Sequence, residues 1–108
     1  MTEEQKHQEP QDQELRKRLN LETSRLPWRE MLKHYAGGNV IGISSDLDLI
    51  EVAVCIARDD TAAVKDWMQS NRLAKVSDEQ AAAWLEEDAD LWAVVVKPWV
   101  LVQRHRGS

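Results

Sequence analysis

Five acidic side chains in the middle of the chain are the residues best suited to chemistry. Asp46, Asp48 and Glu51 lie close together in the sequence, and Asp59 and Asp60 follow soon after. Hard cations such as Mg²⁺ bind several carboxylate oxygens at once, so such a group is the best candidate for a metal site. Aspartate also serves often in turns and helix caps, and that role is favoured here. The alternative function, a metal-dependent enzyme or divalent-cation-binding protein, would use Asp46, Asp48, Asp59 and Asp60.

A thiol beside an imidazole is the second chemistry that the residue types allow, because the base could activate the thiol as a nucleophile. Cys55 lies between Val54 and Ile56, on the small-residue side of a predicted buried strand, where a thiol acts as a small hydrophobe. His34 falls in the last turn of a predicted helix, where an imidazolium favours the helix dipole. The histidines show no metal-ligand spacing. We predict no catalytic residue, no metal ligand and no cofactor.

Tryptophan is unusually frequent, because the chain has five tryptophans and no phenylalanine. Trp67 and Trp84 fall on apolar helix stripes, which predicts that both pack in the core. Trp28 and Trp99 each follow a proline, and either could be a half-exposed anchor for a partner. The residues predicted for an interface are Trp28, Trp99, Val100 and Val102.

The first half of the chain predicts a tail, two helices and a strand. Residues 1–13 are acidic and contain no aliphatic residue after the initiator, so they are expected to be a disordered tail. The spacing of leucines predicts a helix over residues 14–26, and a second helix runs from Pro27 to Gly37-Gly38. Residues 39–44 are short and β-branched, which is typical of a strand.

Residues 47–57 fit two interpretations. Leu47, Ile50 and Val54 suit one face of a helix, whereas the alternation of large and small residues from Ile50 to Ala57 suits a strand covered by helices. We favour the strand, because four large β-branched residues then share one side of a sheet. This choice separates the carboxylates, since Asp46 and Asp48 share one face and Glu51 takes the other.

Two further helices and a long strand complete the prediction. Asp59-Asp60 is expected to start a helix that buries Val64, Trp67 and Met68, and Ser77 to cap a helix that buries Ala81, Trp84 and Leu85. Residues 91–103 are nearly all apolar, which is typical of a strand covered on both faces, and Pro98 must bend it. The expected fold is one α+β domain over residues 14–106, with residues 107–108 as a flexible terminus. About four helices would pack on a small mixed or antiparallel sheet with strands near 39–44, 47–57 and 91–103.

Several stretches together resemble a family of small bacterial proteins, domain of unknown function number 2288. The closing Trp-Val-Leu-Val-Gln segment is the most specific of them. The matching residues are Leu26-Pro27-Trp28, Leu47-Asp48-Leu49, Glu51-Val52-Ala53, Trp67, Asp78-Glu79-Gln80, Trp84, residues 91–96 and residues 98–103. The resemblance implies a bacterial origin and transfers no catalytic or binding residue.

Charge and composition narrow the function. The net charge is −5, with −3 over residues 1–13, +3 over 14–33, −8 over 46–90 and +3 over 91–108. The acidic middle repels a phosphate backbone, which disfavours nucleic acid as a partner. A single cysteine and the lack of a leader indicate the cytoplasm, and no apolar run approaches the roughly 20 residues of a membrane span. We therefore expect a non-catalytic interaction or regulatory domain whose partner is a protein or a second copy.

Overall fold

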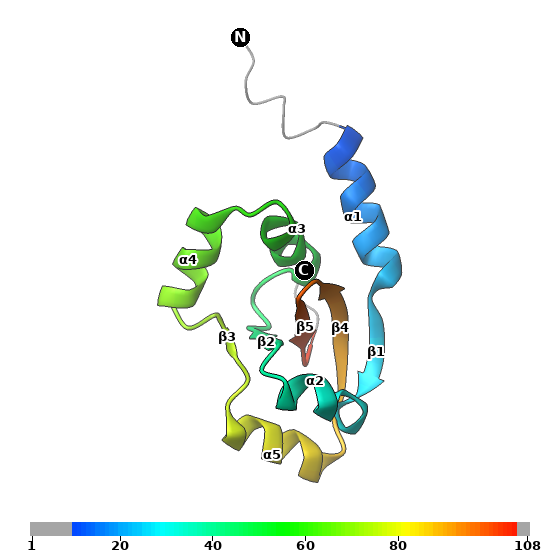
Figure 1. Ribbon diagram of the computed structural model, residues 1–108, viewed down its shortest axis with the longest axis vertical. Helices are drawn as coiled ribbons and strands as arrows, with labels where there is room; N and C mark the ends of the chain where they lie inside the picture. Colours follow the sequence, from blue (N-terminus) through cyan, green and yellow to red (C-terminus); the bar gives the residue numbers. More distant parts are fainter. Residues whose placement is uncertain (1–9, 106–108) are drawn as a thin grey trace.

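The computed structural model describes residues 10–105, which form an α+β fold with one mixed sheet (Figure 1). Within these residues the strands are β1 (Ser24–Pro27), β2 (Val40–Ile43), β3 (Leu73–Lys75), β4 (Asp90–Val96) and β5 (Trp99–Gln103). The helices are α1 (Pro10–Glu22), the 3₁₀ helix η2 (Trp28–Met31), α2 (Leu32–Ala36), α3 (Leu49–Ala57), α4 (Thr61–Gln69) and α5 (Asp78–Glu87). The predicted fold class, an α+β domain with a small mixed sheet, is confirmed.

The sheet has the strand order β1-β4-β5-β2-β3. The neighbours β2 and β5 are parallel, and every other pair is antiparallel. β5 is therefore a central strand, and its last four residues, from Val100 to Gln103, are all buried. The two-sided burial that the apolar run predicts is confirmed for this strand.

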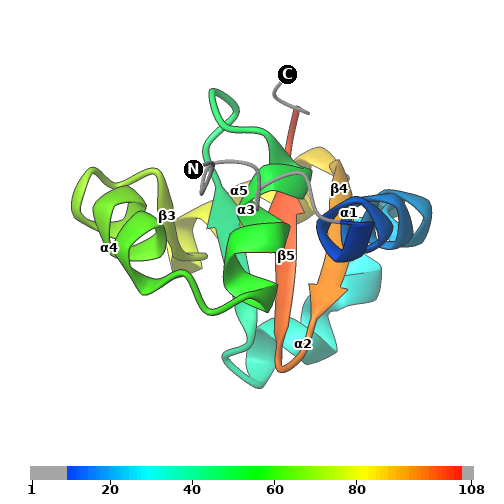
Figure 2. The ribbon, with the colours of Figure 1, turned by 90° about the horizontal axis from the view of Figure 1, so that it is seen from above.

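Helices cover both faces of the sheet (Figure 2). On the face that we call the α3 face, Ile43, Val94 and Leu101 pack in one cluster with residues of α1 and α3, and α4 packs at its margin. On the opposite face, which we call the α5 face, Val40, Val100 and Val102 pack with residues of η2, α2 and α5. Adjacent residues of β5 thus serve two separate hydrophobic clusters.

Residues 91–103 form a hairpin and not one bent strand. The chain reverses at Lys97-Pro98, whose peptide bond is cis, and Val96 then pairs with Trp99. A single strand of thirteen residues would have been unusually long for a small domain, and the proline marks the place where it divides.

The strand expected at residues 47–57 is wrong, because residues Leu49–Ala57 form helix α3. The carboxylate of Asp48 accepts hydrogen bonds from the backbone nitrogens of Ile50 and Glu51, at 2.9 and 3.4 Å, and so caps the helix. Five of the nine residues of α3 are buried, including Val52, Ala53 and Val54 in succession, which hides the helical period in the apolar pattern. Glu51 and Cys55, which are four residues apart, mark its more polar side.

The first helix begins and ends earlier than predicted. It starts at Pro10, so residues 10–13 belong to α1 although the sequence assigned them to a disordered tail. It ends at Glu22, and residues 24–27 form β1, which pairs with β4. Because the residue before a proline favours extended backbone, Pro27 indicates that Leu26 lies in a strand. The remaining parts of the predicted tail and terminus, residues 1–9 and 106–108, lie outside the described residues.

The capping predictions for α4 and α5 hold, whereas part of their predicted burial does not. Asp60 accepts a hydrogen bond from the nitrogen of Ala63, and Ser77 accepts one from the nitrogen of Gln80. Trp67 and Trp84 are half-buried against the two clusters. Met68 and Leu85, which were expected in the core, are 56% and 49% exposed, because each helix contacts the sheet margin along a narrow stripe. None of the helices in residues 10–105 combines the length and the apolar character that crossing a membrane requires.

Candidate functional site

The four aspartates of the predicted metal alternative serve as caps and turn residues. Asp48 and Asp60 cap α3 and α4, and Asp59 adopts a left-handed backbone conformation with φ of 61° between those helices. Asp46 belongs to a different contact network. In residues 10–105, no group of three or more histidine, cysteine, aspartate or glutamate side chains is placed to hold a metal ion.

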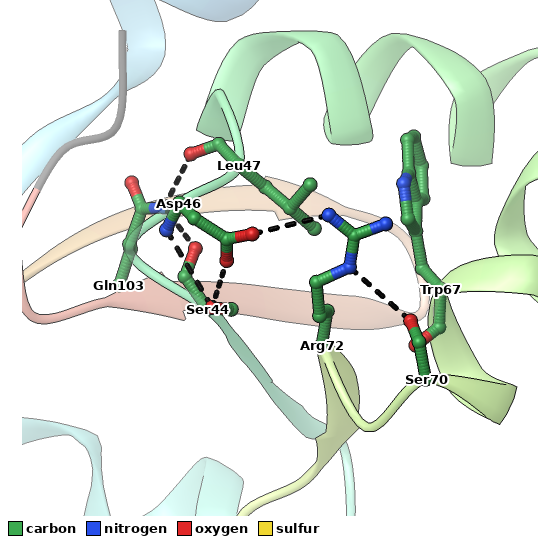
Figure 3. A network of polar contacts seen from close by, with 7 residues as sticks. All are labelled: Ser44, Asp46, Leu47, Trp67, Ser70, Arg72 and Gln103. Atoms are coloured by element: carbon green, nitrogen blue, oxygen red, sulfur yellow. Dashed lines mark hydrogen bonds and ion pairs between the residues drawn. The ribbon is translucent and has the colours of Figure 1, made fainter.

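Asp46 is held by two side chains, as Figure 3 shows. The hydroxyl of Ser44 donates a hydrogen bond to one carboxylate oxygen, and Nη1 of Arg72 lies 3.1 Å from the other. The Ser44 hydrogen bond and then the Arg72 guanidinium lower the pKa of Asp46 below its ordinary value. Arg72 also donates to the hydroxyl of Ser70, at 3.2 Å, so this network joins the end of β2 to the end of α4.

Gln103, which lies on the neighbouring strand β5, contacts the same segment (Figure 3). Its side-chain nitrogen donates to the carbonyl oxygens of Ser44 and Leu47, at 2.8 and 2.7 Å. A buried amide that satisfies two carbonyls fixes the path of the chain between β2 and α3. These polar contacts join β2, α4 and β5, and they engage both carboxylate oxygens of Asp46.

The structure does not bring the thiol and the imidazole together. Cys55 lies on α3 and His34 on α2, and these helices pack on opposite faces of the sheet. Cys55 is half-buried, whereas the sequence placed it in the core. Burial first, and then the charges of Asp60 and Glu51, raise the pKa of its thiol, which opposes formation of a nucleophilic thiolate.

The four predicted interface residues occupy different environments. Trp28, a candidate for a half-exposed anchor, is 1% exposed. Its indole nitrogen donates to the carbonyl of Ala81, at 3.0 Å, and its ring packs edge-on against Tyr35 and Trp84. Val100 and Val102 are also buried, because β5 is central in the sheet. Of the four candidates, Trp99 is the one that reaches a surface.

Trp99 lies in an open groove of about 1030 Å³ on the α3 face. The groove is bounded by α4, by β2 and β3, and by the turn between β4 and β5. Apolar side chains from all these elements and from the end of α3 line it, namely Ile41, Ile56, Val64, Met68, Leu73 and Trp99. A second hollow, which lies beside Trp84 and Arg104, has a less apolar lining.

Charged side chains surround this apolar lining. Lys65 of α4, Lys75 of β3 and Lys97 of the hairpin turn contribute three ammonium groups, and Asp59 and Asp60 contribute carboxylates from the linker between α3 and α4. The ammonium nitrogen of Lys75 lies 5.8 Å from the centre of the Trp99 ring, within the range of a cation–π interaction. The groove therefore combines an apolar floor with a mainly basic margin.

The family model of a protein of unknown function, DUF2288, matches residues 14–104. The chain belongs to the DUF2288 family. The resemblance seen in the sequence is thereby confirmed, and the match covers all five strands of the described residues and the whole groove.

A solved structure has the same fold as this DUF2288 domain. The chain is 37% identical to the protein in the NMR solution structure of PA1075 from Pseudomonas aeruginosa, with a TM-score of 0.74. The likeness covers 90% of this chain and 87% of the other. None of the curated proteins matches the chain.

Sequence reasoning missed the groove in this DUF2288 domain. Met68 and Val64 were assigned to a buried stripe, because their spacing is that of an inward helix face. The one available signal was their polar neighbourhood, since Lys65 and Asp66 lie between them and Thr61 and Gln69 lie on either side. The position of Trp99 opposite α4 depends on the hairpin, which the sequence did not reveal.

Proposed function

We propose that this chain is a non-catalytic interaction domain of the bacterial cytoplasm that binds a partner in the groove between α4 and the sheet. The observation that carries the proposal is the open apolar lining around Trp99 and Met68. Meanwhile, the residues with catalytic potential are committed elsewhere, as caps, ion pairs or a thiol of raised pKa.

The exposed apolar surface favours binding. Met68 is 56% exposed, and a long unbranched thioether adapts to partners of different shape. Trp99 is half-buried beside it and offers a large rigid surface at low entropic cost. These apolar side chains contribute little hydrophobic stabilisation while they are exposed to water. A partner in the groove would bury their surface and gain that hydrophobic free energy.

Two other observations support the proposed cytoplasmic location and the bacterial origin. Cys55, the one cysteine of the chain, can form no internal disulfide, which suits a reducing cytoplasm. The similar solved structure comes from a bacterium, Pseudomonas aeruginosa.

The proposal is tested with anilinonaphthalene sulfonate, an apolar dye that carries one negative charge. The dye is expected to bind the full-length folded protein with a rise in its fluorescence. Met68→Asp places a carboxylate in the groove and should weaken dye binding about tenfold or more.

Leu85→Asp is the matched control, because Leu85 is a similarly exposed apolar residue on α5, outside the groove. Circular dichroism verifies that both variants keep the fold. If the native protein leaves the dye dark, or if both variants weaken binding equally, the groove is not the binding site.

A further inference from the structure

Within residues 10–105, the lysines around the groove differ from most other cationic side chains in their ion pairing. Six arginines form ion pairs with acidic side chains, namely Arg16, Arg18, Arg29, Arg58, Arg72 and Arg104. Lys65, Lys75 and Lys97 make no ion pair with another residue of the described part, 10–105. Three ammonium groups without an ion pair in residues 10–105 thus surround one apolar lining, beside the two carboxylates of Asp59 and Asp60, in a chain whose net charge is −5.

We propose that the groove accepts an acidic amphipathic helix of a partner protein. This inference rests on the proposed function and specifies the chemistry of the partner. The apolar face of the helix would contact Ile41, Met68 and Trp99, and its flanking glutamates or aspartates would meet the lysines.

The arrangement of layers favours a helix. On the α3 face, α1 and α3 cover the strands β4, β5 and β2 (Figure 2). Ile41 and Trp99 lie near the N-terminal ends of the parallel strands β2 and β5 and are half-buried. The groove lies on that part of the sheet, with α4 as one wall. A helix is the element that normally completes such a layer on a sheet.

The charges favour an acidic partner. Residues 46–90 sum to −8, yet two of their four basic residues, Lys65 and Lys75, line the groove. Asp59 and Asp60 are the acidic part of the margin.

The experiment uses two synthetic peptides of about 16 residues, a length at which a helix can form once it is bound. Both carry leucines at positions i, i+3, i+4 and i+7; one carries glutamates on its polar face and the other carries lysines. Amide NMR of the nitrogen-15-labelled full-length protein follows the binding. The acidic peptide is expected to shift amides of α4, β3 and residue 99, and the basic peptide to leave them unchanged.

Charge reversal tests the lysines with a matched control. The double variant Lys65→Glu/Lys75→Glu should weaken the acidic peptide about tenfold. Lys17→Glu/Lys33→Glu changes the net charge equally at exposed positions outside the groove, and it should leave the affinity unchanged. Equal weakening by both double variants would mean that net charge governs binding, and it would overturn the inference.

Other occupants give different results, and each would overturn the inference. Tighter binding of monomeric laurate than of the acidic peptide assigns the groove to a lipid. A dimer in sedimentation velocity that Met68→Asp dissolves assigns it to a second copy. If the dye binds but neither peptide shifts the amides, this inference is overturned and the proposed function still holds. If neither the dye nor the peptides bind, the inference and the proposed function are both overturned.

Discussion

The side-chain nitrogen of Gln103 lies 2.7 Å from the carbonyl oxygen of Leu47, and this hydrogen bond joins the last strand to the segment that leads into α3. The same nitrogen donates to Ser44, at 2.8 Å, and the side chain of Gln103 is buried. A polar residue suits this position because the buried Leu47 carbonyl needs a donor, and the Ser44 carbonyl accepts a second hydrogen bond beside that from the backbone N–H of Leu47.

Gln103→Leu should therefore destabilise the fold by about 2 kcal/mol, because the Leu47 carbonyl loses its side-chain donor and the Ser44 carbonyl keeps only the backbone N–H of Leu47, at 3.1 Å. Urea unfolding followed by tryptophan fluorescence measures the change. Gln13→Leu, at an exposed position of α1, is the control and should change stability by less than about 0.5 kcal/mol. Equal urea midpoints for the two variants would show that the Gln103 hydrogen bonds make no net contribution to the free energy of unfolding.

The elements that were predicted well have local signals at their ends. Ser77 and Asp60 cap their helices where the sequence placed the caps, because a capping side chain contacts residues only three positions away. The short β-branched segment of residues 39–44 was predicted as a strand, and the structure confirms it as β2. These features depend on neighbours in the chain and need no knowledge of the tertiary fold.

The elements that were missed depend on distant contacts. Helix α3 resembles a strand in sequence because its surroundings bury Val52 and Val54 on different sides of the helix. The groove joins Trp99, Ile41 and Met68 from three parts of the chain, and its existence follows from the hairpin at Lys97-Pro98. A pattern of residue types carries no record of such contacts.

Gly38→Ala should destabilise the protein by about 1 kcal/mol through backbone strain alone. Gly38 has φ of 78°, which L-residues rarely adopt, while a methyl group there would meet no atom within 4 Å. Gly37→Ala is the matched control, because Gly37 has φ of −78° and a methyl group there makes ordinary contacts. Thermal or urea unfolding should separate the two variants, and equal stabilities would contradict the strain argument.

The Asp46 network should make stability depend on acidification. The Ser44 hydrogen bond and the Arg72 guanidinium hold the folded-state pKa of Asp46 below its ordinary value of 3.8. The stabilisation is therefore complete above the pKa of the unfolded chain and is lost as the pH falls through the folded-state pKa. Asp46→Asn should flatten this part of the profile of unfolding free energy against pH. An NMR titration of the Asp46 carboxyl checks the cause, and Ser44→Ala should raise its pKa.

Cys55 should react slowly with iodoacetamide, since burial and the charges of Asp60 and Glu51 raise the pKa of its thiol above the ordinary 9.0. Fewer thiolates then exist at neutral pH than in a free cysteine, and the thiolate is the reacting species. Glu51→Gln removes one negative charge and leaves the Arg16 guanidinium, which lowers the thiol pKa, so its alkylation should accelerate. The same chain unfolded in urea provides the reference rate. Alkylation of the folded protein faster than that reference would indicate an activated thiol, and it would reopen the nucleophilic chemistry that the position of His34 argues against.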